Sequence, residues 1–378
     1  MDDLKPEDQS RSQAAHAPPQ TRRGSQLVKT WLFRLVVVLV PTLIGLFAVV
    51  VVLAYQERLV RNPLTGEFRF QRPPLYVQEP NYETTGHKYL YDERLGWKNI
   101  PHWKWTSLGE KLTINSKGLR DQEHAHHKPP GTRRILVLGD SYAWGYGVSD
   151  EMLFSEILEQ RLRGQQISWQ VINSGVSGWG TDQELLFLEQ EGFKYQPDIV
   201  VLAFFIANDP ENNSKSRQYG LDKPLFVDTH LQLANVPVPK PGSAASVIKS
   251  EADAGDLTLA IIKRMATLCG EHGCDLIVAK FGEFLFEDTE PFRDLSDRLS
   301  KQLPKLPRVT YIDLDQVYLD LKVAPMEILV GNNDGHWNPY GHWLTADVLL
   351  KSLSDSGDIE AKDIRDVDSP GSRAARRR

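Results

Sequence analysis

The sequence predicts a three-layer α/β/α domain with a parallel sheet, preceded by one membrane-spanning helix. From Arg134 onward, apolar stretches of strand length alternate with stretches that have helical spacing. Alternation of this kind produces a parallel sheet that helices cover on both faces. In the N-terminal part, the 21 residues from Leu35 to Tyr55 carry no charge, which is typical of a helix in a membrane.

The strands and helices of the domain follow from these stretches. RILVLGDS, which begins at Arg134, is a nearly continuous apolar run, as expected for a parallel strand buried on both faces. The predicted strands are 134–141, 169–175, 198–209, 274–281 and 309–314. The predicted helices are 152–162, 183–193, 257–269, 291–303 and 340–353.

The uncharged N-terminal stretch is long enough to cross a bilayer, because 21 helical residues extend about 30 Å. We interpret it as an uncleaved anchor, since a long region precedes it and no A-x-A cleavage site follows. Lys and Arg are balanced on its two sides and do not decide the orientation. Long domains translocate largely regardless of charge, so the expected arrangement is a single-pass membrane protein with an extracytoplasmic (periplasmic) domain.

Changes in composition predict the boundaries of the domains. The predicted segments are a disordered tail (1–30), a transmembrane helix (31–55), a β-rich juxtamembrane extension (56–130), the α/β domain (131–354) and a disordered polar tail (355–378). Within the domain, residues 210–256 interrupt the alternation and contain a hairpin pattern. An insertion that directly follows a strand end is positioned to cover a site.

Composition also narrows the range of partners. The net charge is −6 and no basic stripe is present, so nucleic acid is not expected as a partner. Glu123, His124, His126 and His127 are metal-binding types, but the Lys-Pro-Pro that follows favours a solvated linker, and no metal or cofactor is predicted. Cys269 and Cys274 are either a disulfide or two buried thiols at a helix-to-strand junction.

Polar residues follow each of the first three strands and precede the last helix. They are Gly139-Asp140-Ser141, the stretch 173–178 (NSGVSG), Asn208-Asp209 and the stretch 334–338 (DGHWN). Ligands of open parallel sheets bind at the carboxyl ends of the strands, so these groups can meet at one edge.

Acyl transfer is the chemistry that these groups can perform together. A serine hydroxyl needs a base, and His336 can accept the proton of Ser141. Asp334 can orient the histidine. The backbone N–H groups of Ser141 and Gly178 and the side-chain amide of Asn208 are suitable donors for an oxyanion.

At these four blocks the sequence resembles the SGNH, or GDSL-type, hydrolases. GDSYAWG, NSGVSGWGTDQ, IAND and DGHWNPYGH match the four blocks of the family in order, over roughly residues 134–353. The resemblance implies a flavodoxin-like α/β/α fold, Ser141 as nucleophile, His336 as base, and Gly178 and Asn208 as oxyanion donors. The lead-in DERLGWKN…INSKGLRD resembles membrane-bound bacterial members.

Two positions depart from the family pattern. Ala207 stands where glycine commonly precedes the asparagine. The acid commonly lies three residues before the histidine, but that residue is Asn333, and the carboxylate is at Asp334. Trp144, Tyr146, Trp179 and Trp337 flank the motifs and either stack on sugar rings or pack in the core.

The functional prediction is a membrane-anchored serine ester hydrolase that removes acyl groups from an envelope glycan or a small ester. A polysaccharide O-acetyltransferase with the same catalytic groups is the first alternative. The second is a non-catalytic envelope assembly protein on the same scaffold. The complete set of nucleophile, base and oxyanion donors argues against the second alternative.

Overall fold

The computed structural model describes residues 22–55, 59–61, 68–70, 89–107, 110–163, 167–243, 245–286, 289–331 and 334–359. Most of both predicted tails lies outside these ranges. The chain divides into two units, Met1–Val60 and Arg61–Arg378. Each unit is described by itself.

The first unit contains helix α1 (Arg22–Tyr55), which begins earlier than the predicted start at residue 31. Its stretch Phe33–Val51 is long and apolar enough to cross a membrane, and none of it is buried. A signal sequence has the same properties, so the helix by itself leaves both interpretations open. Strands β1 (Leu59–Arg61) and β2 (Phe68–Phe70) follow along the chain.

Five parallel strands form the central sheet of the second unit, as predicted. They are β7 (Thr132–Gly139), β8 (Ser168–Asn173), β9 (Ile199–Phe205), β14 (Asp275–Phe281) and β15 (Val309–Asp313). The order across the sheet is β8-β7-β9-β14-β15. In chain order these are strands 2-1-3-4-5, which is the flavodoxin-like arrangement. The strand order therefore reverses between β7 and β9, where ligands of such sheets bind.

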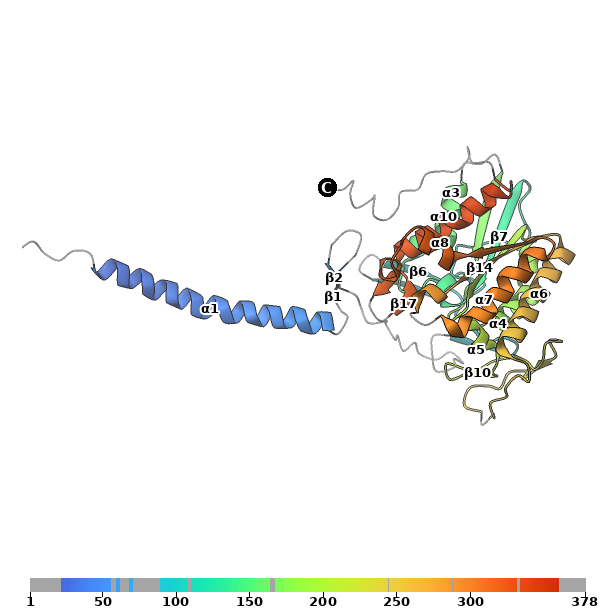
Figure 1. Ribbon diagram of the computed structural model, residues 1–378, viewed down its shortest axis with the longest axis horizontal. Helices are drawn as coiled ribbons and strands as arrows, with labels where there is room; N and C mark the ends of the chain where they lie inside the picture. Colours follow the sequence, from blue (N-terminus) through green and yellow to red (C-terminus); the bar gives the residue numbers. More distant parts are fainter. Residues whose placement is uncertain are drawn as a thin grey trace, which may run out of the picture. The chain divides into compact units, whose positions relative to one another are not determined.

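Helices cover both faces of the sheet and complete the predicted three layers (Figure 1). Helices α3 (Phe154–Leu162), α8 (Leu314–Asp320) and α10 (Pro339–Asp355) pack on one face, and α4 (Thr181–Gln190), α6 (Ala254–His272) and α7 (Glu290–Gln302) pack on the other. Successive residues of β7 alternate between the two cores: Ile135 and Val137 face the first set of helices, and Leu136 and Leu138 face the second. Both faces of the strand are buried, which explains its nearly continuous apolar sequence.

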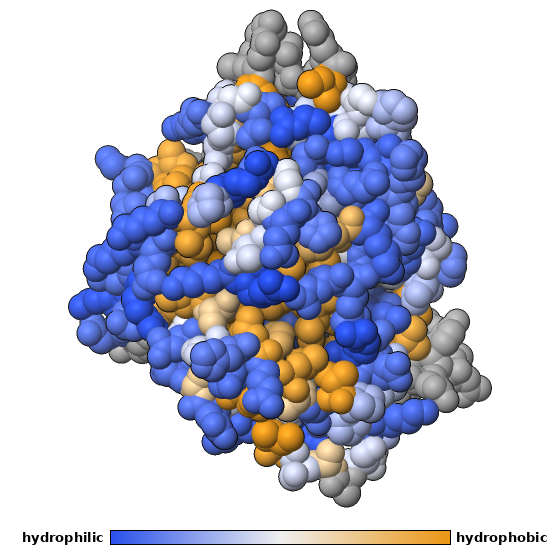
Figure 2. Space-filling view, turned by 90° about the vertical axis from the view of Figure 1, so that its right-hand side faces the viewer, coloured by the Kyte–Doolittle hydropathy of each residue, from blue (hydrophilic) through white to orange (hydrophobic). Residues whose placement is uncertain are grey.

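The surface is polar where the helices meet solvent. Figure 2 shows the face at the right of Figure 1, where hydrophilic residues predominate and hydrophobic ones are visible between them. This distribution is expected when helices pack their apolar sides on a sheet and turn their polar sides outward.

Two further regions carry short strands. Before the sheet, β3 (Tyr89–Asp92) pairs with β4 (Gly96–Asn99), and β5 (Lys104–Ser107) pairs with β6 (Glu110–Thr113). In the insertion, β10 (Arg217–Gln218) pairs with β11 (Leu221–Asp222), and β12 (Leu225–Phe226) pairs with β13 (Leu233–Ala234). The second of these hairpins is the one that the sequence predicts, and the first was not predicted.

The remaining elements are short. They are helices α2 (Ser141–Trp144), α5 (Asp209–Asn213) and α9 (Pro325–Ile328), the hairpin of β16 (Leu329–Gly331) and β17 (Asp334–Trp337), and 3-10 turns at Asp150–Met152, Gly192–Tyr195, Glu283–Leu285 and Leu303–Lys305.

Candidate active site

Ser141 lies at the carboxyl end of the central strand β7. The strand ends at Gly139, and Asp140 caps the short helix α2, of which Ser141 is the first residue. A side chain at 139 would collide with its neighbours, because a Cβ there would lie 2.7 Å from the Cβ of Ala143. Glycine therefore permits the tight turn that presents the serine at the edge of the sheet.

His336 reaches this serine from β17, 195 residues later in the chain. Its Nε2 lies 2.7 Å from the Ser141 hydroxyl oxygen, a hydrogen-bonding distance. The Tyr142 hydroxyl donates to the carbonyl of Gly335, which holds the backbone beside the histidine. The Tyr142 and Tyr146 rings lie 5.0 and 4.7 Å from the imidazole, measured between ring centroids. The imidazole is thus fixed against the serine by aromatic contacts.

The third predicted member of the triad, Asp334, contributes its backbone to β17, but its side chain lies outside the described residues. Its role stays a prediction. The carboxylate that the structure describes near His336 is Asp140, which is buried beneath the serine. Burial raises the pKa of Asp140, and hydrogen bonds from the Tyr142 amide and the Asn208 side chain, together with the charge of His336, act against this rise.

Asn208 follows β9 and connects the third block to the first. Its side-chain nitrogen donates to Asp140 at 3.0 Å. An amide nitrogen carries two hydrogens, so this bond leaves a second one, which an oxyanion could accept in place of the Tyr219 hydroxyl. The side chain of Asn208 also contacts the Tyr219 hydroxyl.

Gly178, the other predicted donor, has φ +83° and lies below the Tyr219 ring. A Cβ at this position would approach a ring carbon of Tyr219 to 3.0 Å. A side chain here would strain the backbone and push against the tyrosine, so glycine suits the position for two reasons.

Ser141, Gly178, Asn208 and His336 all line one cavity of about 400 Å³. The other described side chains on its wall are Tyr89, Trp97, Tyr142, Tyr146, Ser177, Phe205, Tyr219 and Leu221. Four of these, Tyr89, Trp97, Tyr219 and Leu221, come from the β3–β4 and β10–β11 hairpins. The sequence interpretation missed them. The available signal was Gly220, since glycine suits the second position of a two-residue hairpin turn.

The β3–β4 hairpin is joined to the second block by buried tryptophans. The Trp97 indole donates to the Ser177 carbonyl at 3.2 Å, and the Trp179 indole donates to the Trp97 carbonyl at 2.9 Å. Trp144, Trp179 and Trp337 are buried, so packing is their role, whereas Tyr146 lines the cavity. Of the four aromatic residues named from the motifs, only Tyr146 is available for stacking on a substrate.

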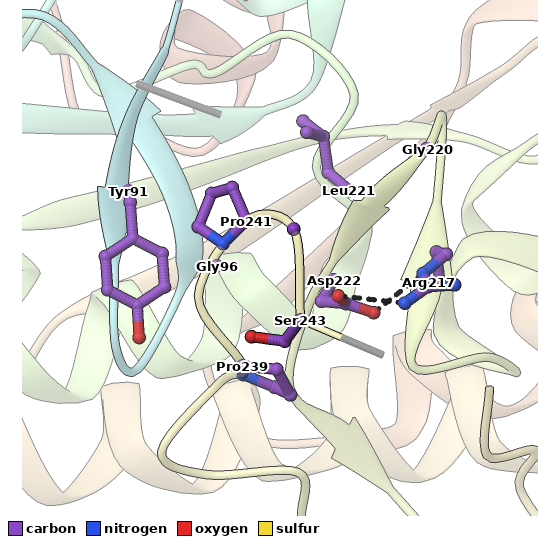
Figure 3. Close-up of a pocket in the computed structure, with 10 residues that line it drawn as sticks. Tyr91, Gly96, Arg217, Gly220, Leu221, Asp222, Pro239, Pro241 and Ser243 are labelled. Carbon is purple, nitrogen blue, oxygen red and sulfur yellow. Dashed lines mark hydrogen bonds and ion pairs between the residues drawn. The ribbon is translucent and has the colours of Figure 1, made fainter. Parts of the chain in front are cut away.

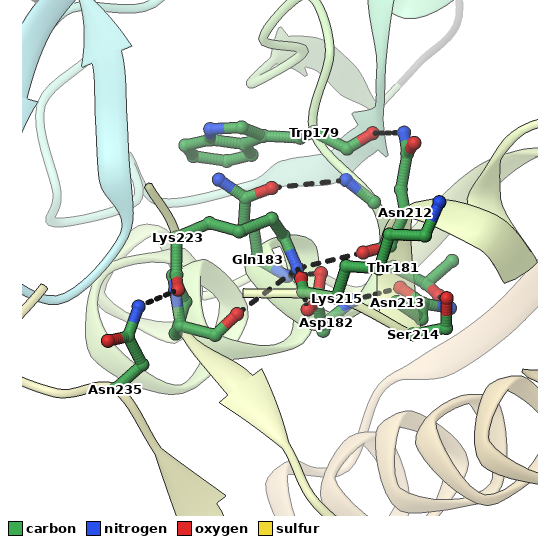
Figure 4. Close-up of polar contacts among 12 residues, drawn as sticks. Trp179, Thr181, Asp182, Gln183, Asn212, Asn213, Ser214, Lys215, Lys223 and Asn235 are labelled. Atoms are coloured by element: carbon green, nitrogen blue, oxygen red, sulfur yellow. Dashed lines mark hydrogen bonds and ion pairs between the residues drawn. The ribbon is translucent and has the colours of Figure 1, made fainter. Parts of the chain in front are cut away.

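The insertion is anchored to the domain by a buried ion pair (Figure 4). The Lys223 ammonium contacts the Asp182 carboxylate at the start of α4 and also donates to the carbonyls of Asn212 and Pro224, at 3.0 and 3.1 Å. Both side chains are fully buried. Burial lowers the pKa of Lys223 and raises that of Asp182, and the attraction between them opposes both shifts.

Two more buried carboxylates, those of Glu184 and Asp209, have no ion-pair partner in the described part of the chain. Both carboxylate oxygens of Glu184 and one oxygen of Asp209 are buried without a hydrogen bond in the described part of the chain. Burial raises the pKa of Glu184 well above its usual value, and repulsion from Asp140 and Asp182 adds to the effect. The pKa of Asp209 is raised well above normal by burial and by the charge of Glu184.

The other candidates from the sequence do not join the site. His124 contacts Asp121 and His126 contacts Glu191, so these histidines have separate partners. Over the described ranges, no group of three His, Cys, Asp or Glu side chains is arranged to hold a metal. Cys269 and Cys274 are buried free thiols in hydrogen-bonding contact, so the disulfide stays a prediction. A further histidine, His342 on helix α10, is buried against Phe154, and burial lowers its pKa to about 3.

No protein-family model matches the chain, and no curated protein matches it. Solved structures of esterases are similar at low identity. A lipolytic protein of the G-D-S-L family from Desulfitobacterium hafniense is 14% identical over 58% of this chain and 99% of that one, with a TM-score of 0.39. Axe2, an acetylxylan esterase from Geobacillus stearothermophilus, is 17% identical over 58% of this chain and 94% of its own, with a TM-score of 0.40.

A third structure, the acetyl xylan esterase AlAXEase, is 15% identical over 58% of this chain and 99% of that one, with a TM-score of 0.41. The comparison returns the SGNH hydrolases, the family that the motifs resemble. At these TM-scores the likeness decides neither the reaction nor the substrate of this chain.

Proposed function

We propose that the chain is a serine ester hydrolase whose nucleophile is Ser141 and whose base is His336. The observation that carries the proposal is the 2.7 Å contact between the Ser141 hydroxyl and His336 Nε2. This contact lies at the strand-order reversal of a flavodoxin-like sheet, in a cavity large enough for a small ligand. A serine with an adjacent histidine is the arrangement that nucleophilic acyl transfer requires.

The reaction follows from this geometry. The Ser141 oxygen attacks the acyl carbon while His336 Nε2 takes the hydroxyl proton. The N–H groups of Ser141 and Gly178 and the amide of Asn208 stabilise the oxyanion. His336 then donates the proton to the departing alkoxide, and an acyl-enzyme forms at Ser141. Water, deprotonated by His336, attacks this ester, and His336 returns the proton to the Ser141 oxygen as the acid is released. Asp334 orients the imidazole, and the charge of Asp140 helps to stabilise the imidazolium.

An acylated glycan of the cell envelope is the proposed substrate class. The cavity offers the rings of Tyr89, Tyr146 and Tyr219 for contact with the apolar faces of a sugar.

The decisive test uses the full chain purified in detergent. It is incubated with aryl esters of increasing acyl length and, separately, with a fluorophosphonate probe. We expect turnover of short acyl esters and labelling at Ser141 alone, located by peptide mass spectrometry. Labelling at a different serine, or absence of both labelling and turnover, would refute the proposal.

Water is the proposed acceptor of the acyl group. A surface transferase needs an activated donor outside the cell. In the described part of the chain one helix is long and apolar enough to span a membrane, and one helix does not form a channel for such a donor. An acetyl donor ester supplied with and without an oligosaccharide separates the two reactions. Free acid in both conditions supports hydrolysis, whereas release that depends on the sugar, with acyl groups appearing on it, indicates a transferase.

Helix α1 is proposed to anchor the chain, with the domain outside the cytoplasm. The exposed apolar stretch Phe33–Val51 supports the anchor. Reporter enzymes fused to the C-terminus test the side of the membrane. A reporter that is active only in the cytoplasm would contradict this orientation, and recovery of a shortened chain lacking α1 would identify a cleaved signal sequence instead.

A further inference from the structure

Figure 3 shows a second cavity, of about 260 Å³. It shares Leu221 with the catalytic cavity and has no part in the proposed mechanism. The side chains on its wall that matter here are Tyr91, Arg217, Leu221, Asp222, Pro241 and Ser243. They come from the same two hairpins that complete the catalytic cavity, β3–β4 and β10–β11, and from the loop after β13. The juxtamembrane extension and the insertion therefore build this second cavity together.

The walls of the second cavity are held in place by hydrogen bonds. The Arg217 guanidinium donates twice to the Asp222 carboxylate, at 2.8 and 3.0 Å, and once to the Ala245 carbonyl at 3.1 Å. The Tyr91 hydroxyl donates to the Val238 carbonyl at 2.5 Å. A cavity with fixed walls loses little conformational entropy when a ligand binds, which favours binding.

The two cavities are neighbours along both hairpins. Leu221 lines both of them. On β3, Tyr89 lines the catalytic cavity and Tyr91 lines the second one. Residues two apart on a strand lie on the same face, about 6–7 Å from each other. The two cavities therefore lie close enough for one chain-like ligand to contact both.

The side chains on the wall of the second cavity suit a neutral sugar. Tyr91 and Pro241 provide ring surfaces for the apolar face of a pyranose, and Asp222 and Ser243 provide oxygens for its hydroxyls. The charge of Arg217 is already balanced by the bidentate contact with Asp222. Among the described residues that line this cavity, Arg217 is the cation and it is already paired, so a neutral glycan is favoured over an anionic ligand.

We propose that this second cavity is a glycan subsite, which binds the sugar units next to the acylated unit in the catalytic cavity. The proposal rests on the proposed esterase function and narrows its substrate class to neutral acylated oligosaccharides. The chain should accordingly prefer acetylated oligosaccharides to acetylated monosaccharides.

The test fills the subsite and leaves the catalytic cavity intact. Ser243 is exposed at the rim, so Ser243→Trp places a large ring there without burying it in the core. Ser300→Trp, at an exposed position on α7, is the matched control. The full chain and both variants are assayed on an aryl acetate, on acetylated xylose and mannose, and on acetylated xylotetraose and mannotetraose.

We expect wild type and Ser300→Trp to turn over at least one tetrasaccharide about tenfold more efficiently, in kcat/KM, than its monosaccharide. Ser243→Trp should lose this preference and keep its aryl acetate activity, which also shows that the variant folds. Equal efficiency on short and long sugars in wild type would overturn the subsite, and so would a preference that survives in Ser243→Trp.

A failed esterase proposal is recognised separately, by absence of aryl acetate turnover in wild type. In that case calorimetric titration with unmodified xylotetraose and mannotetraose decides the subsite. Binding by wild type and Ser300→Trp that is lost in Ser243→Trp supports it, and absence of binding to wild type refutes it.

Discussion

The catalytic cavity has two halves that differ in origin and in chemistry. Ser141 and Asn208 follow the ends of the sheet strands β7 and β9, and His336 lies in β17 of the short β16–β17 hairpin. These three residues carry the hydroxyl, the amide and the imidazole. Opposite them, Tyr89, Trp97, Tyr219 and Leu221 come from two hairpins outside the sheet. We call these the sheet half and the hairpin half. The sheet half contains the groups that take part in the proposed proton transfer, and the hairpin half determines the shape of the cavity.

This difference predicts which kinetic parameter a substitution in each half should change. Changes in the sheet half should lower kcat, because they remove interactions made in the transition state. Changes in the hairpin half should alter KM, substrate choice or stability, and they should leave the chemistry in place. The predictions below test this division, beginning with the largest expected effect.

Ser141→Ala and His336→Ala should each reduce ester turnover by about 10⁴-fold or more, because nucleophile and base act as a unit. Steady-state assays on an aryl acetate measure the loss, and circular dichroism checks the fold. The double variant should be no slower than either single one. Additive losses would mean that the two residues work independently, which would contradict the sheet half as described.

Lys223→Ala should destabilise the protein by about 3–5 kcal/mol, because Asp182 would remain buried without its cation. Denaturant unfolding measures the change. Lys215→Ala is the matched control, since its ion pair with Glu211 is partly exposed and is worth at most about 1 kcal/mol. Equal effects for the two lysines would show that the hairpin half does not depend on the buried anchor.

Asn208→Ala should lower kcat by about 10²-fold with little change in KM, as expected when one oxyanion donor is lost. Asn208→Asp keeps the size of the side chain but removes its N–H donors, so it should be impaired at least as much. An active aspartate variant would show that Asn208 has only a structural role.

Glu184→Gln should have the smallest effect, a gain of the order of 1 kcal/mol that depends on pH. The pKa of Glu184 is raised in the folded state, so the folded protein binds the extra proton. That contribution to stability is complete at pH values below about 4.3, the pKa of a glutamate in the unfolded chain. It is lost as the pH rises through the pKa that Glu184 has in the folded protein. The glutamine variant should therefore melt higher than wild type at pH 8 but not at pH 4.

Glu189→Gln, at an exposed position of the same helix α4, is the control and should show no such pH dependence. If the two variants respond alike to pH, the buried carboxyl of Glu184 does not limit stability.

The sequence predicted the fold and the sheet half because both follow local rules. A strand buried on two faces reads as an apolar run, and site residues follow its end, so the positions of Ser141 and Asn208 could be inferred directly. The hairpin half could not be inferred in this way. Trp97 precedes Ser177 by 80 residues, and their contact depends on how the extension packs on the second block. Nothing in the local pattern around Trp97 specifies that packing.

Asp140 shows a second limit. The sequence placed it only among the polar residues that follow the first strand. In the structure its carboxylate accepts one hydrogen bond from the Tyr142 amide within the first block and one from the Asn208 side chain in the third block. The unpaired burial of Glu184 and Asp209 was also not expected, because helix spacing does not show whether a side chain has a hydrogen-bond partner. Tertiary contacts decide whether a polar group in the core has a hydrogen-bond partner, and sequence patterns do not encode these contacts.

The turn at Tyr219 affects both the stability of the insertion and the shape of the catalytic cavity. Tyr219 and Gly220 both have positive φ, as a two-residue type I′ turn requires, and tyrosine is unfavourable at the first position. Asn at 219 would relieve strain of about 1 kcal/mol or more and would remove the ring above Gly178. Selection for heat resistance alone would accept that exchange, and selection for substrate choice would reject it. Position 219 is therefore a place where thermostability and specificity trade against each other.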